Sequence, residues 1–187
     1  MPPNYKKLQE KITFDDLMET LSEEFEQLPD HRRANSSYEL ADVLRSAFAM
    51  FSLKSPSLLA FKELTRQEEK NLKAIYRIQS VPSDTQMRTT LAPFSPAPLR
   101  TLFAKLFHKL SEAGVIKEYE YWKGQLLISI DGVEHFCSTK VHCKHCTTRA
   151  HRNGETSYHH SGLAAVVVHP DQEEVFTLDF EPILNAD

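Results

Sequence analysis

Apolar residues recur every three or four positions through most of the chain before Gly114, which is the spacing of one face of an α-helix. Ser36 is predicted to open a helix, and Glu39, three residues later, would complete a capping box with it. We expect the first helix to end near Leu28, the third near Arg66 and the last at Gly114. The pattern predicts five helices, each opened by a residue that favours helix N-termini: Thr13, Ser36, Ser55, Ser83 and Ser95.

Beyond Lys123-Gly124 the pattern changes to short apolar runs rich in β-branched residues, which predict strands. A buried strand over 126–130 would end on Asp131, and a second strand lies within 157–169. A third strand over 174–180 follows a tight turn and must therefore be antiparallel to the second. The sequence predicts an α+β fold with a helical region over 1–120 and a β region over 121–187.

The composition is that of an ordinary folded domain, with 41% hydrophobic and 26% charged residues. The sequence contains no apolar run of about 18 residues, so no membrane partner is expected. Residues 1–7 lack the apolar region of a secretory signal, which predicts a cytoplasmic protein.

The charge distribution is uneven. Residues 1–124 carry 18 Lys and Arg against 17 Asp and Glu, whereas residues 125–187 carry 4 against 9. Within that acidic part, residues 136–154 contain no acid at all. Such a segment fits either a solvated loop or a surface that contacts nucleic-acid phosphates. Its basic residues, together with one in a predicted helix-turn-helix that begins at 84–91, are candidates for DNA contacts: Lys140, Lys144, Arg149, Arg152 and Arg88.

Three cysteines lie close together, which is typical of metal ligands or free thiols rather than of a disulfide framework. Cys143-x-x-Cys146 is a knuckle that can place two thiolates on one tetrahedral Zn²⁺, with Cys137 as a third ligand. His151 is the first choice for a fourth ligand, followed by His142 and His135. Four protein ligands would make the site structural, and free cysteines on a polar hairpin are the alternative.

Asp131 is the sharpest candidate for chemistry, because it follows an apolar strand and precedes Gly132. A carboxylate at such a point can hold a divalent ion for phosphoryl transfer, whereas an ordinary turn residue is the alternative. Only one of His159 and His160 can face the side of Asp131, because neighbouring strand residues point to opposite faces. Glu181, after the third strand, is either a further ligand or a solvated acid.

In chain order, these residues resemble the first part of the catalytic domain of bacterial insertion-sequence transposases of the DDE type. The resemblance covers roughly residues 80–187. It is carried by Pro82 to Arg88, Leu127 to Phe136, His142-Cys143 with Cys146, Asn153-Gly154, Tyr158-His159-His160, Val168-His169-Pro170 and Glu181-Pro182-Ile183.

The resemblance implies an RNase H-like fold, with Asp131 as the first of three catalytic acids that hold Mg²⁺ or Mn²⁺. It implies a protein that binds the ends of its own mobile DNA, cleaves a strand and joins it to target DNA, and that associates with the nucleoid when bound. Only the first three, antiparallel strands and a Cys/His hairpin insertion would be present here, without the other two acids. We therefore expect no strand transfer by this chain alone and an exposed apolar sheet face. Homo-oligomers, or association with a full-length transposase, would follow.

Two other functions remain open on the sequence. The chain could be a non-enzymatic DNA-binding or inhibitory fragment in which the zinc-binding hairpin and the helices contact DNA, and Asp131 is a turn residue. It could also be a structural helical adaptor that carries a zinc hairpin.

Overall fold

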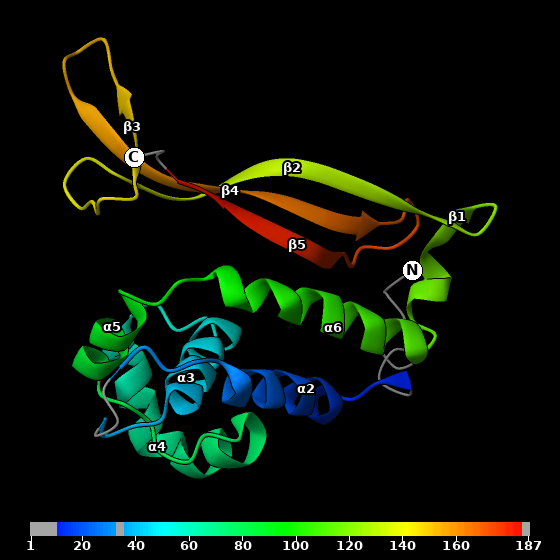
Figure 1. Cartoon of the computed structure of the whole chain (residues 1–187), viewed down its shortest axis with the longest axis horizontal. Helices are drawn as coiled ribbons and strands as arrows, with labels where there is room; N and C mark the ends of the chain where they lie inside the picture. Colours follow the sequence, from blue (N-terminus) through cyan, green and yellow to red (C-terminus); the bar gives the residue numbers. More distant parts are fainter. Residues whose placement is uncertain (1–10, 33–35, 185–187) are drawn as a thin grey trace. The chain divides into compact units, whose positions relative to one another are not determined.

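A computed structural model describes residues 11–32 and 36–184 of the 187-residue chain. The expectation about a signal segment concerns residues 1–7, which lie outside this description. The described residues confirm an α+β protein with helices first and strands second (Figure 1). They divide into two compact units, one within residues 12–102 and one that contains residue 11 and residues 103–184. The predicted boundary at 120/121 lies within the second unit.

The first unit is helical and has one apolar core. Met18 and Leu21 of its first helix pack with Phe61, Leu72 and other buried side chains. Beneath them lies a buried Arg45, which pairs with Asp42 and Glu26. Asp42 also accepts hydrogen bonds from the backbone N–H groups of residues 79 and 80, so the buried charges are satisfied. The helices are α2 (Phe14–Gln27), α3 (Leu40–Ser52), α4 (Leu58–Tyr76) and α5 (Asp84–Leu91).

Several predicted helix ends are confirmed and others are wrong. Thr13 caps α2 in a full capping box with Asp16, and Ser83 caps α5. The capping box predicted at Ser36 is wrong, because Glu39 itself is the N-cap residue of α3 and makes no side-chain cap. The helix predicted to end near Arg66 continues as α4 to residue 76, with a non-helical break at residue 68.

The second unit holds the end of α6 (Arg100–Glu112), a 3₁₀ turn at Ile116–Tyr119 and an antiparallel sheet. The longest strands lie side by side in Figure 1, with β4 between β2 and β5. The short β3 pairs with the start of β4, and β5 pairs with the rest of the same edge. The strands are β1 (Glu120–Trp122), β2 (Gln125–Ser138), β3 (Thr147–Ala150), β4 (Thr156–Val168) and β5 (Phe176–Ile183).

The ladder between β2 and β4 sets which side chains share a face. It pairs Asp131 with Ala164 and Cys137 with His159, and a bulge interrupts it between Glu134 and Phe136. Such a bulge sets one extra residue on β2 against β4. Because of the bulge, Glu134 and Cys137 lie on the same face although they are three residues apart.

Two predictions for the first strand are wrong. Asp131 does not end the strand, because Gly132 and Val133 stay paired with β4 and carry β2 on to residue 138. The strand is not buried either: Ile128 is 50% exposed and Ile130 is 64% exposed. Leu127 and Val133, which point to the opposite face, are each 44% exposed. Apolar side chains on both faces of β2 are therefore exposed to solvent, rather than on the one face that we expected.

The turn between the second and third predicted strands is confirmed. The Gln172 N–H donates to the His169 carbonyl, and the Asp171 N–H donates to His169 Nδ1. No helix among the described residues is both long and apolar enough to cross a membrane.

Gly162 on β4 provides a test of the sheet packing. A Cβ at this position would lie 2.1 Å from Cζ of Phe180 on β5, so the ring would have to leave its place. We expect Gly162→Ala to destabilise the sheet by about 1–3 kcal/mol, the usual cost of overpacking, as measured by urea unfolding.

Gly132→Ala is the matched control on β2, because a Cβ there has nothing within 4 Å. Alanine restricts the unfolded chain more than glycine does, so this variant should be as stable as the parent or slightly more stable. Equal effects of the two substitutions would contradict the packing described for Phe180.

Candidate metal centre

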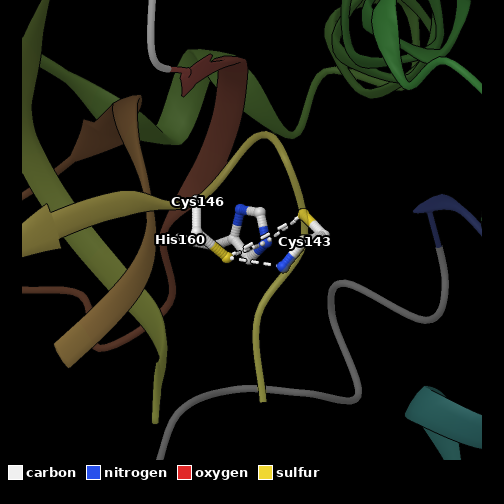
Figure 2. A group of neighbouring side chains, drawn as sticks. All are labelled: Cys143, Cys146 and His160. Atoms are coloured by element: carbon white, nitrogen blue, oxygen red, sulfur yellow. Dashed lines mark hydrogen bonds between the residues drawn. The ribbon is translucent and has the colours of Figure 1, made fainter. Parts of the chain in front are cut away.

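Adjacent histidines on β4 point to opposite faces of the sheet, and each joins a different group of metal-ligating side chains. Figure 2 shows the first group, in which the His160 ring lies between Cys143 and Cys146. His160 Nε2 is 3.3 Å from each sulfur, and the two sulfurs are 3.8 Å apart. Three donor atoms from a loop and a strand thus form a compact triangle that could hold a metal ion.

The loop between β2 and β3 is folded locally so that both cysteines point the same way. The Cys146 N–H donates to the Cys143 carbonyl, which closes a tight turn, and the Cys143 N–H donates to the Cys146 sulfur at 3.3 Å. Ser138 Oγ, at the end of β2, accepts from the N–H groups of Lys140 and Val141. These backbone hydrogen bonds fix the loop so that both sulfurs face the same point.

The group is anchored on one side and open on the other. Cys146 is 2% exposed and His160 is half-buried, whereas Cys143 is exposed. The rings of His135 and Phe136 lie 6.1 and 5.6 Å from the His160 ring and hold its orientation. A bound ion would therefore be reached from the side of Cys143.

The ligand set predicted from the sequence is only partly brought together. Cys143 and Cys146 meet as expected, but Cys137 belongs to the other group, because its place on β2 puts it on the opposite face. His151 lies at the turn after β3, where its Nε2 is 2.7 Å from Ser157 Oγ. The next choice, His142, stacks on Tyr158 with ring centroids 4.2 Å apart.

His160 takes the place of these predicted ligands. Strand alternation predicted only that one of His159 and His160 faces the side of Asp131, and the register shows that His160 is the one. Its proximity to the cysteines was not foreseen, because it depends on how the 138–146 loop returns over β4. The usable signal was the alternation of His159 and His160, which required one of them to lie on each face.

The second group consists of Glu134, Cys137 and His159, with donor atoms that all lie within 4.8 Å of one another. No spacing in the sequence indicated that a carboxylate from β2 would join a cysteine and a histidine. His159 is 5% exposed, whereas Glu134 and Cys137 are exposed.

Asp131 stands apart from both groups. It is exposed at mid-strand, and its Oδ1 accepts the N–H of the following Gly132 at 2.7 Å. Glu181 pairs with Leu163, one position along from the partner of Asp131, so its side chain points to the opposite face. Among the residues that the structure covers, no cluster of three ligands includes Asp131.

The basic candidates are all exposed. Lys140 and Lys144 lie in the loop that carries the metal group, Arg149 lies on β3 and Arg152 lies in the turn that follows. Arg88 lies in the last turn of α5, in the other unit. The division between the units runs through α6, so the helix-turn-helix remains a prediction.

Comparison with known proteins assigns no family: no protein-family model, no curated protein and no solved structure matches the chain. The resemblance to DDE transposases therefore remains a hypothesis carried by the residues named above.

The unequal burial of the three thiols predicts their order of reaction. In metal-free protein we expect a maleimide to modify exposed Cys137 and Cys143 quickly and Cys146, which is buried, at least tenfold more slowly. Peptide mass spectrometry of timed samples would measure the three rates separately.

The same reaction in concentrated urea is the control, because unfolding should bring the three rates together. Equal rates in the folded protein would contradict the burial of Cys146.

Proposed function

We propose that this chain is a DNA-binding protein in which Zn²⁺, held by Cys143, Cys146 and His160, fixes a basic hairpin against the backbone of DNA. The single observation that carries the proposal is the triangle of two sulfurs and one imidazole nitrogen, whose two cysteines lie on the acid-free segment 136–154. We further propose, from the residue resemblance, that this DNA-binding activity belongs to a DDE-type transposase; this second proposal is called the transposase setting below.

The spacing of the three donors suits zinc. A tetrahedral Zn²⁺ with Zn–S about 2.3 Å and Zn–N about 2.0 Å separates two sulfurs by about 3.8 Å and a sulfur from a nitrogen by about 3.5 Å. The sulfurs of Cys143 and Cys146 are 3.8 Å apart, and each is 3.3 Å from His160 Nε2. A small outward movement of His160 would complete the geometry. Two thiolates and an imidazole also select zinc over Mg²⁺ or Mn²⁺.

Zinc at this position would act on the conformation of the hairpin. It would tie the 138–146 loop to β4, and β4 is in turn paired with β3. Lys140 and Lys144 belong to the tied loop, and Arg149 belongs to β3. With the loop held, these cations form a surface of fixed shape, so that less conformational entropy is lost when they contact phosphates.

The transposase setting rests on different features. β2, β4 and β5 follow one another as an antiparallel series, the order expected for the first three strands of an RNase H-like domain. Asp131 lies on the first of these strands. No group of three ligating side chains among the described residues includes Asp131, so the proposal assigns no cleavage step to it.

The first test is zinc-dependent DNA binding. We expect the zinc-loaded chain to bind duplex DNA with a logarithmic salt slope of about −3 to −4, the value for about four phosphate contacts. A chelator, or the double substitution Cys143→Ser/Cys146→Ser, should weaken binding at least tenfold. Added zinc should restore the chelated protein but not the variant. Fluorescence anisotropy at several salt concentrations would measure both effects.

Two variants that each lose two positive charges distinguish DNA contacts by the hairpin from a general effect of net charge. Arg149→Gln/Arg152→Gln should reduce the salt slope by about 2, or about one per cation. The control, Lys70→Gln/Lys117→Gln, removes two other exposed cations and should leave the slope unchanged. If chelation leaves DNA binding unaltered, or if both variants behave alike, the zinc-fixed hairpin is not the DNA-contacting surface.

The choice of DNA tests the family setting separately. A transposase should prefer the flanks of its own gene over a shuffled sequence of the same length. Equal affinity for the two would refute the transposase setting while leaving the zinc-dependent contact with DNA intact.

A further inference from the structure

We infer that Glu134, Cys137 and His159 form a second metal site on the opposite face of the sheet, which takes a divalent ion of the zinc class. The inference does not depend on the proposed function. It rests on the mutual approach of a carboxylate oxygen, a sulfur and an imidazole nitrogen to within 4.8 Å, on residues that the first site does not use.

The β-bulge in β2 assembles this group. Cys137 lies directly opposite His159 in the ladder, so the two side chains leave the sheet together. The bulge then brings Glu134 to the same face, where its Oε2 is 2.8 Å from His159 Nδ1. Bulges are designed features that re-aim side chains, often beside functional sites.

His159 is held as metal-bound histidines are held. One ring nitrogen, Nδ1, faces the carboxylate, while the other, Nε2, is 2.6 Å from Ser157 Oγ. Ser157 is in turn 2.7 Å from His151 Nε2. Outer partners of this kind fix the tautomer and the ring direction of a ligating histidine. His151, predicted as a direct zinc ligand, would thus support a site from one step away.

The same contacts have the order of a nucleophile, a base and an acid, but they do not suit hydrolysis. Ser157 is 3% exposed and its oxygen contacts two imidazoles, so a substrate carbonyl could not reach it. Glu134 and Cys137, by contrast, are exposed and leave an entry route for an ion. Three protein ligands would leave the fourth position to water, which is the arrangement of zinc sites with an open position.

Cobalt titration of the full chain tests this inference. We expect the parent to bind about two equivalents of Co²⁺, with thiolate-to-cobalt absorption from three sulfurs. Cys137→Ser and His159→Gln should each reduce the stoichiometry to about one, and Cys137→Ser should remove about a third of that absorption. Cys143→Ser/Cys146→Ser should also leave about one equivalent, but with about a third of the absorption remaining.

Ser157→Ala tests the outer partner. Loss of this hydroxyl should weaken the affinity for the second ion by about 10–100-fold and leave the affinity for the first ion unchanged. A general loss of structure would lower both affinities. Glu134→Gln should weaken the second ion only, and Glu173→Gln is the matched control at an exposed acid.

Other outcomes would overturn the inference. The parent protein could bind a single ion, with an affinity that Cys137→Ser and Cys143→Ser both lower. That result would mean that the cysteines share one site. A stoichiometry unchanged by Cys137→Ser and His159→Gln would exclude the second site. Suppose instead that the Cys143→Ser/Cys146→Ser variant binds as many ions per chain as the parent, whereas Cys137→Ser and His159→Gln bind fewer. The proposed zinc site would then be wrong and the second site would stand.

Discussion

The register between β2 and β4 is the constraint on which both metal groups depend. It places Cys137 opposite His159 and Phe136 opposite His160, so that one strand serves two faces. Because side chains alternate along a strand, a slip of one residue between β2 and β4 would exchange the faces of β2 and separate Glu134 and Cys137 from His159. On the other edge of β4, Gly162 pairs with Pro182 and leaves room for the Phe180 ring, which helps to fix the register between β4 and β5.

The two units are stabilised in different ways. The helical unit buries an apolar core and a satisfied set of charges around Arg45. The sheet exposes large apolar side chains on β2 and β4, and its one fully buried aliphatic side chain, Val167, pairs with Phe176, which packs on the buried Tyr119. Burial also raises the pKa of Tyr119, helped by the nearby negative charges of Glu174 and Glu118. The opposite end of β4, which carries both histidines, has little apolar burial of its own. Metal ligation would supply order there, as it does in small domains that lack a sufficient core.

Local chemistry explains which elements could be predicted from the sequence. Thr13 and Ser83 cap their helices as expected, because capping needs only a short polar side chain a few residues from free N–H groups. β4 and β5 were also found, since apolar runs joined by turn residues define a hairpin. β3 was missed, because Thr147 to Ala150 is short and has no alternating pattern.

The candidate site was predicted less well, because it depends on contacts between distant residues. The pair Cys143 and Cys146 was visible in the sequence, since the knuckle is local. Its third member, His160, lies beyond β3, and only the sheet register brings it back. The same holds for the exposure of β2: an apolar, β-branched run indicates a strand, but whether that strand is covered depends on the rest of the fold.

The bulge at residues 134–136 has a consequence for comparing this protein with others. On an unbroken strand, positions three apart face opposite sides, so Glu134 and Cys137 could not share a face. A relative that kept this three-residue spacing but paired the strand without a bulge would keep every cysteine, histidine and glutamate and still lack the second group. Ligand identity is therefore a poor guide to this centre. The bulge has to be preserved along with the residues themselves.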